Sequence, residues 1–210
     1  MKQTSALLIL FFSIFAVPSY GQFYFDWGSN SNSCSTNYSS GYKKLGNGKT
    51  VYVTDDPQEY YSSGNLKKAT LYYDTYLKTG SGKSLYIESD HEVTFFDNGA
   101  LKKARMTYDG YLKGGDGKSY YVESDNYVRF YKDGALKYFT PQYSGYIKTG
   151  AGKSLYISDD GRIELHKDGS LRSGILEYSS YIKRPNGSSE YVKSGTRIEL
   201  DKNGALIGCR

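Results

Sequence analysis

The chain repeats itself with a period of 35 residues, and this repetition constrains its fold more than any other feature. The segment that begins at Tyr76 reads YLKTGSGKSLYIESDHEVTFFDNGALKKARMTYDG, and similar segments begin at Tyr111 and Tyr146. A shorter copy begins at Tyr181, and a diverged copy of 34 residues begins at Tyr42. Such a period is typical of folds in which each unit buries its apolar face against its neighbours. We therefore expect one repeat domain over residues 42–210, with units 42–75, 76–110, 111–145, 146–180 and 181–210.

Each unit is predicted to contain four short β-strands. In the unit that opens at Tyr76, Leu85 and Ile87 alternate with Tyr86, and a similar alternation follows after a turn. Alternation with a period of two residues, bounded by turn residues, is typical of strands. The Asp-Asn-Gly turn at 97–99 favours a hairpin, because Asn-Gly and Asp-Gly tolerate positive φ. No segment has helical periodicity, so the sequence predicts an all-β fold.

The recurring phrase KTGSGKS, at residues 78–84, resembles a phosphate-binding loop, but its spacing excludes one. A phosphate-binding P-loop needs a glycine five residues before Gly82, where this chain has Leu77. It also needs a helix after the loop, and here a strand is expected. The two glycines are therefore interpreted as a tight turn between strands.

The two ends of the repeat domain are complementary in sequence. The last unit stops just into its fourth strand, and residues 36–41, TNYSSG, resemble the part that it lacks. On this alignment Cys34 and Cys209 fall at the unit position of Ala104. The Cα atoms of a disulfide lie about 4.4–6.8 Å apart, so pairing of these cysteines within one chain requires the first and last units to be neighbours. Residues 22–41 would then be a leader and closing strand.

These observations predict a closed five-bladed β-propeller with a disulfide between Cys34 and Cys209. The alternative is an open β-meander or solenoid, in which the two cysteines pair between molecules.

The N-terminal residues predict export. Lys2 precedes an apolar run of twelve residues at 6–17, and the small residues Ser19 and Gly21 mark a cleavage site after Gly21. The run is shorter than the about 20 residues that a membrane-spanning helix needs. Residues 1–21 are therefore predicted to be a signal peptide, and the mature protein to be secreted, extracellular or periplasmic, without a membrane span.

Composition excludes two further classes of protein. The formal net charge of +5 is spread along the chain, whereas a nucleic-acid-binding protein usually concentrates its basic residues on one face. The chain has 24 tyrosines and 9 phenylalanines, and disordered chains are poor in aromatic residues. We therefore expect a folded protein without a nucleic-acid partner.

The phrases FFDNGALKK, FYKDGALKY and LDKNGALIG resemble the aromatic-x-D/N-G-x-L core of bacterial MORN-type and related surface β-hairpin repeats. They are also similar to the hairpins of cell-wall- and glucan-binding repeats. The resemblance covers nine residues per unit and implies a cell-surface repeat protein. The tryptophans that dominate the binding repeats are missing, because the single tryptophan, Trp27, lies outside the units.

Nothing in the repeat favours catalysis. His91 and His166 occupy different positions in their units, so no histidine site recurs. Several aspartates lie between the second and third strands, where an aspartate often bonds its own backbone in a turn. They are Asp55, Asp56, Asp90, Asp125, Asp159 and Asp160. We predict that the protein is not an enzyme and uses no cofactor or metal.

Two recurring columns of side chains are the candidate ligand-binding residues. The tyrosine column contains Tyr52, Tyr86, Tyr121, Tyr156 and Tyr191. Its rings can stack on sugars while the hydroxyls form hydrogen bonds, and the alternative is that they pack between sheets. The lysine column contains Lys44, Lys78, Lys113, Lys148 and Lys183, joined by the turn lysines Lys49, Lys83, Lys118 and Lys153. It favours an anionic polymer, and the alternative is a solvated strand face.

The sequence thus predicts a secreted, non-catalytic, lectin-like protein that binds a glycan or an anionic polysaccharide at several sites. Repetition converts weak sites into avidity. The alternative is a structural or adhesive scaffold that contacts proteins at the cell surface or in the extracellular matrix. Equivalent pockets between tyrosines would favour a lectin, and a broad flat patch would favour a protein partner. An enzyme would need one pocket that breaks the symmetry, and residues 23–33 are the only candidate segment for it.

Overall fold

The computed structural model describes residues 36–210, so the predicted signal peptide (1–21), most of the leader (22–41) and Cys34 lie outside the described residues. Every regular element within residues 36–210 is a β-strand, which confirms the all-β prediction. This part of the chain contains no helix that is long and apolar enough to cross a membrane.

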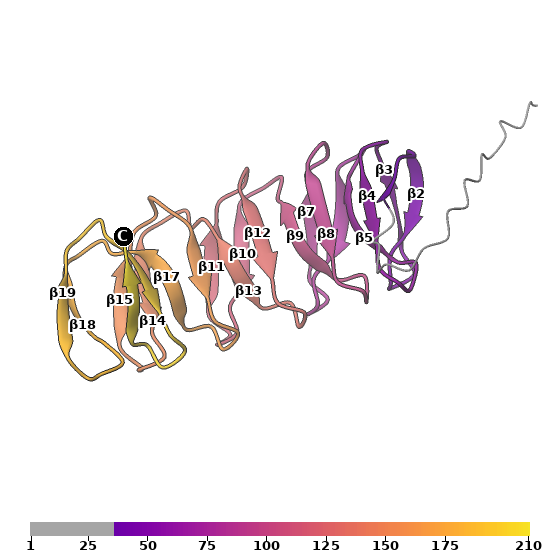
Figure 1. Cartoon of the computed structure of the whole chain (residues 1–210). Coiled ribbons are helices and arrows are strands. Elements are labelled where there is room, and N and C mark those ends of the chain that lie inside the picture. The colour runs from indigo at the N-terminus through magenta and orange to yellow at the C-terminus, as the bar shows by residue number, and fades with distance from the viewer. Residues whose placement is uncertain (1–35) are drawn as a thin grey trace, which may run out of the picture. The chain divides into compact units, whose positions relative to one another are not determined.

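Eleven strands form one antiparallel sheet, and their order in the sheet is their order in the chain (Figure 1). They are β1 (Thr36–Asn37), β4 (Gln58–Tyr60), β5 (Leu66–Thr70), β8 (Glu92–Phe95), β9 (Leu101–Arg105), β12 (Tyr127–Phe130), β13 (Leu136–Phe139), β16 (Ile163–Leu165), β17 (Leu171–Ile175), β20 (Arg197–Leu200) and β21 (Leu206–Cys209). Each full unit therefore contributes two neighbouring strands to a continuous sheet.

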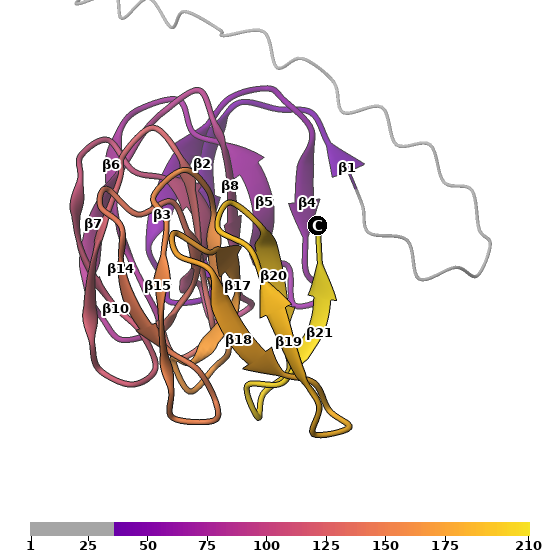
Figure 2. The same cartoon turned by 90° about the vertical axis from the view of Figure 1, so that its left-hand side faces the viewer.

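The other strands form five separate hairpins, one per unit. Their strands are β2 (Gly41–Lys44) and β3 (Thr50–Val53), β6 (Thr75–Lys78) and β7 (Ser84–Ile87), β10 (Gly110–Lys113) and β11 (Ser119–Val122), β14 (Gly145–Lys148) and β15 (Ser154–Ile157), and β18 (Ser180–Lys183) and β19 (Ser189–Val192). Figure 2 shows these hairpins on one side and the strands of the large sheet on the other.

The core lies between the hairpin layer and the sheet layer. In β7 and β8, Ile87 and Phe95 are each 1% exposed, whereas Tyr86 and Thr94 next to them point outward. Burial of one such side chain stabilises the folded state by about 1.5–3 kcal/mol. Because the pattern recurs in each unit, both layers have one buried and one solvent-facing side.

The sheet is open, so the prediction of a closed five-bladed propeller is wrong. β1 and β21 are its two edges, with nine strands between them. The four strands of a unit do not form one blade either, because the hairpin and the sheet strands lie in different layers. The chain changes layer after β7, at a turn where Asp90 has φ of 58°. The alternative of an open β-meander is compatible with this strand order.

The predicted disulfide has no support either, because β1 and β21 are opposite edges of the open sheet. Cys209 is an exposed free thiol, and Cys34 lies outside the described residues. The pairing register also corrects the alignment of the N-terminal strand. Asn37 on β1 pairs with Gln58 on β4, and Ala69 on β5 pairs with Val93 on β8. Gln58 and Val93 occupy the same unit position, so their partners Asn37 and Ala69 do too. Asn37 therefore lies at the unit position that the sequence alignment assigned to Cys34.

The turn KTGSGKS joins neighbouring units, which explains its repetition. A Cβ added to Gly80 would lie 2.0 Å from the backbone oxygen of Lys132 in the following unit. The same close approach occurs at the other first glycines of the turn, which are Gly46, Gly115 and Gly150. The second glycine has a different role, because Gly82 has φ of +84°, a conformation that side chains disfavour. The interpretation of the phrase as a turn is therefore confirmed.

Candidate binding surface

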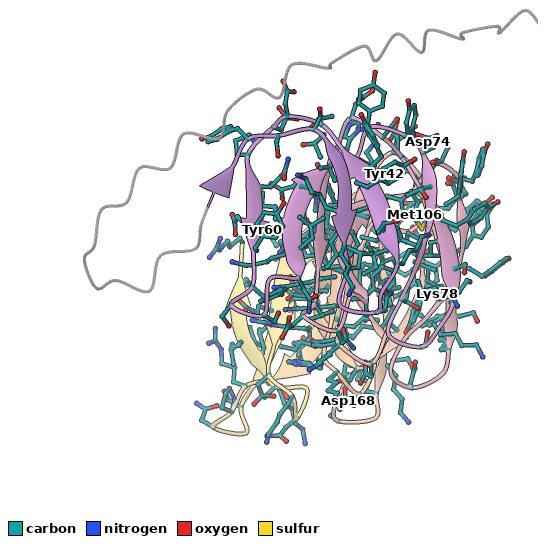
Figure 3. The ribbon with its side chains drawn as sticks, turned by 90° about the vertical axis from the view of Figure 1, so that its right-hand side faces the viewer. Tyr42, Tyr60, Asp74, Lys78, Met106 and Asp168 are labelled. Carbon is teal, nitrogen blue, oxygen red and sulfur yellow. The ribbon has the colours of Figure 1, made fainter. Side chains whose placement is uncertain are left out.

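The outward side of the hairpins brings the two predicted columns together. In β6, Leu77 is buried, whereas Tyr76 and Lys78 on either side of it are exposed. Pairing of Tyr76 with Tyr86 across the hairpin places the tyrosine and lysine columns on the same side of the layer. Figure 3 shows Lys78 on the hairpin side and Tyr60 on the side of the large sheet.

We call this surface the tyrosine face. It contains the cross-strand pairs Tyr42–Tyr52, Tyr76–Tyr86, Tyr111–Tyr121, Tyr146–Tyr156 and Tyr181–Tyr191, with Lys44, Lys78, Lys113, Lys148 and Lys183. The ring centroids of each pair are 4.8–5.1 Å apart.

A third tyrosine extends most of these pairs into trios. Tyr108, in the bend after β9, stacks on Tyr86 with ring centroids 5.8 Å apart and an angle of 11° between the planes. Tyr143 and Tyr178 stack in the same way on the next two pairs, and Tyr72 meets Tyr52 edge-on. Each trio therefore presents a small aromatic platform.

The outer members of the trios are the most exposed. Tyr76 and Tyr108 are 62% and 66% exposed, whereas Tyr86 is half-buried between them. The predicted residues Tyr52, Tyr121 and Tyr156 are half-buried like Tyr86. Tyr191, against which no third tyrosine of the described residues packs, is 54% exposed. Sequence reasoning missed the outer members, although the turn length already implied that Tyr76 faces Tyr86.

The lysines have two different roles. Lys44, Lys78, Lys113, Lys148 and Lys183 are exposed on the tyrosine face. The turn lysines instead bond to the next hairpin: Lys153 Nζ donates to the carbonyl oxygen of Tyr181 at 2.9 Å. Lys49, Lys83 and Lys118 donate in the same way to the carbonyl oxygens of Tyr76, Tyr111 and Tyr146, respectively. Partial burial lowers the pKa of Lys49, and the nearby Lys78 ammonium adds to this shift.

Carboxylates lie beside two of the trios. Asp74 Oδ1 accepts a hydrogen bond from the backbone N–H of Ser89 at 2.7 Å, and Asp109 Oδ1 accepts one from Ser124 at 2.6 Å. Hydrogen bonds from the side chain and backbone of Ser89 lower the pKa of Asp74, and those from the backbone and side chain of Ser124 lower the pKa of Asp109, so both carboxyls are ionised at neutral pH. Partial burial and the charge of Asp74 raise the pKa of Tyr86. Its phenol therefore stays protonated and can donate a hydrogen bond.

Hollows lie between successive hairpins. One of about 270 Å³ is lined by Tyr111 and Tyr121 of the third hairpin, by Tyr146 of the fourth and by Tyr143 in the bend before β14, with Lys118 at its side. Another, of about 640 Å³, lies between the turn of the second hairpin and β10, and Lys83 and Lys113 line it. The tyrosine face is thus hollowed between its third and fourth platforms.

The histidines and turn aspartates have structural partners. Arg105 donates to His91 Nε2 at 2.8 Å, so His91 Nδ1 carries the proton and donates to the carbonyl oxygen of Ser89. Thr54 donates to Asp56 at 2.9 Å within one of the turns. Across residues 36–210, no group of three or more His, Cys, Asp or Glu side chains is placed to hold a metal ion.

Comparison with known proteins adds no relative. No protein-family model matches the chain, and no curated protein matches it.

Proposed function

We propose that this chain is an exported, non-catalytic protein that binds carbohydrate through the tyrosine face at several equivalent sites. The observation that carries the proposal is the recurrence of exposed tyrosine platforms, each with a lysine on the same side of its hairpin. Similarity to MORN-type surface repeats belongs to the same proposal. Its support is that the aromatic-x-D/N-G-x-L phrase forms the turn between β8 and β9, where Gly99 has φ of 75°.

The chemistry of the platforms suits sugars. Contiguous exposed aromatic area is unusual on a protein surface and marks interaction sites. Tyrosine offers an apolar ring face to the C–H face of a sugar and a hydroxyl to its hydroxyls. The carboxylate of Asp74 and the ammonium of Lys78 add an acceptor and a donor beside the rings.

Repetition provides the affinity that a shallow site lacks. Five hairpins with the same outward residues can contact a polymer of repeating sugars at several points. Once one site is occupied, the others bind at high effective concentration. The hollow between the third and fourth platforms favours this function over adhesion to a flat protein surface.

A structural or adhesive scaffold is the second candidate, and the edge strand β21 favours it. Ile207 on this strand is 53% exposed, and no described strand pairs with its outer edge. Exposed strand edges readily pair with other chains.

The test is binding of the mature protein to a panel of neutral and anionic glycans at low and high salt. The key variant carries Tyr76→Thr, Tyr111→Thr and Tyr146→Thr, because threonine keeps the β-propensity of these exposed strand positions. Ile207→Thr is the matched control, since it also trims an exposed strand residue but lies outside the tyrosine face. We expect salt-insensitive binding of a neutral glycan polymer that the triple variant weakens about tenfold or more.

Equal binding by the triple variant and the control would contradict the proposal. If only anionic glycans bind, and their affinity falls as salt rises, the lysines rather than the tyrosines would be the ligand-binding residues. If no glycan binds, the scaffold is the better candidate.

A further inference from the structure

The outer side of the large sheet, opposite the tyrosine face, contains a pocket of about 520 Å³ over β8, β9, β12 and β13. We call it the cationic pocket. Its charged lining residues are all basic: Lys102, Lys103, Arg129, Lys132, Lys137 and Lys167. The rings of Phe96 and Tyr131 form part of its wall.

The pocket breaks the repeat. Arg129 lies at a unit position that holds Thr94 in the preceding unit and Glu164 and Glu199 in the following ones. Lys103 lies at the position of Tyr138 in the next unit. Lys103 and Arg129 therefore break the repeated pattern, and they add two cations to the basic residues that recur at the unit positions of Lys102 and Lys132.

A missing contact between units coincides with the pocket. The hydroxyl of Tyr61 donates to the carbonyl oxygen of Phe95 in the next unit, and Tyr131 donates in the same way to Leu165, both at 2.8 Å. Phe96 occupies the equivalent position between them but has no hydroxyl, so it cannot make this bond to Phe130. Both Phe96 and Phe130 line the pocket.

Only two of the six cations in the pocket form ion pairs with described carboxylates. Lys103 pairs with Glu92 at 2.9 Å and Lys167 pairs with Asp133 at 3.5 Å. The other four cations, Lys102, Arg129, Lys132 and Lys137, form no ion pair with any described residue. Three of them lie over aromatic rings instead, with Lys102 5.7 Å from the ring centre of Phe96.

The pairing of strands brings two of the cations together. Lys103 and Arg129 face each other directly across β9 and β12. Like charges at such opposite positions destabilise a sheet. Glu92 offsets the charge of Lys103, and a bound anion would offset that of Arg129.

We propose that the cationic pocket binds a compact ligand that carries two or more sulfate or phosphate groups, such as an oligosaccharide esterified with them. Five of the six cations are lysines, which bind phosphate as point charges, and so many cations around one hollow suit groups with a high density of negative charge. The volume lies in the range of pockets that hold small ligands.

Carboxylates on both sides limit the length of the ligand. One row of paired residues crosses the sheet, and Lys103 and Arg129 lie at its middle. Toward one edge the row reaches Glu59, and toward the other it reaches Glu164 and Glu199. A long polyanion laid along the sheet would meet these carboxylates, whereas a compact one would not.

The test is titration calorimetry with sucrose octasulfate and inositol hexakisphosphate, which separate the sulfate from the phosphate source. Inorganic sulfate and duplex DNA are the comparison ligands. Lys132→Gln removes one charge from the pocket, and Lys202→Gln is its matched control, because Lys202 occupies the same unit position two units later and lies outside the pocket.

We expect at least one of the two compact polyanions to bind with an affinity that falls as salt rises. Lys132→Gln should weaken this binding about three- to tenfold, and Lys202→Gln should leave it unchanged. The tyrosine triple variant should also leave it unchanged, so failure of this proposal and failure of glycan binding by the tyrosine face are distinguishable.

Equal weakening by Lys132→Gln and Lys202→Gln would overturn the proposal in favour of a diffuse basic surface. Tighter binding of duplex DNA than of either compact polyanion would also overturn it. So would binding of inorganic sulfate with the affinity of sucrose octasulfate, because the pocket would then hold only single ions.

Discussion

At the scale of single residues, two glycines of one turn are required for different reasons. Gly80 is required by space, because Lys132 of the next unit lies where a side chain would begin. Gly82 is required by its backbone conformation, and nothing lies within 4 Å of an added Cβ there. In the last unit the chain has Pro185 at the position of Gly80, and no further described unit packs against it.

We expect Gly80→Ala to lower the free energy of unfolding by more than about 2 kcal/mol, because backbone atoms of two units would have to move apart. Gly82→Ala should lower it by about 1–2 kcal/mol, the strain of a left-handed residue. Pro185→Ala should change it by less than about 0.5 kcal/mol. Urea unfolding followed by circular dichroism measures all three. A Gly80→Ala variant as stable as Pro185→Ala would refute the proposed contact between units.

At the scale of elements, one carboxylate joins three neighbouring strands. Glu92 on β8 accepts from Lys68 on β5 at 2.6 Å and from Lys103 on β9 at 2.9 Å. Burial alone would raise the pKa of Glu92, but the hydrogen bonds from both lysines outweigh it, and the pKa is lowered. The contact between units 1 and 2 therefore depends on an ionised side chain.

This lowered pKa predicts loss of stability in acid. A carboxyl with a lower pKa in the folded state stabilises the fold above its unfolded pKa of about 4.3, and the stabilisation is lost as pH falls through the folded pKa. Glu92→Gln should lower the free energy of unfolding at pH 7 by up to about 1 kcal/mol, because the group is partly exposed. It should also reduce the loss between pH 5 and pH 3, measured by urea unfolding.

Glu199→Gln is the control for this change, because Glu199 makes only a longer contact of 3.9 Å with Arg172. A Glu92→Gln variant with the same pH dependence as the unaltered protein would contradict the prediction.

At the scale of the whole molecule, the sequence predicts strands well and their arrangement poorly. The alternation of Leu85, Tyr86 and Ile87 is a local property, so it identified strand β7 and the side on which its tyrosine lies. Which strands pair is decided by contacts that the pattern does not encode. Hairpins stacked on a continuous sheet and four-stranded blades have the same alternation of apolar and polar residues. The alternation therefore could not distinguish the two arrangements, and the predicted closed ring was wrong.

One of the two candidate sites could be predicted from the sequence, and the other could not. The tyrosine column could be found because it recurs with the repeat. The cationic pocket could not, because Lys103 and Arg129 are 26 residues apart and become neighbours only through the register of β9 and β12. In the sequence each of them is an ordinary surface charge on a strand.

The open sheet makes a prediction about Cys209. Ala104, at the same unit position, is 0% exposed and belongs to the core, and β12 of the next unit pairs with its strand. Cys209 lies on the edge strand β21 and is exposed. We therefore expect iodoacetamide to alkylate Cys209 in the folded monomer, as identified by peptide mass, because accessible thiols react and buried ones are inert.

The matched control is the double variant Ala104→Cys/Cys209→Ser, which moves the thiol to the covered copy of the same position. Its thiol should react at least about tenfold more slowly under conditions in which circular dichroism shows both proteins to be folded. Equal rates would mean that the sheet opens between units in solution. A monomer in which Cys209 is cross-linked to Cys34 would contradict the open sheet itself, because that bond requires β21 to lie beside the N-terminal strand.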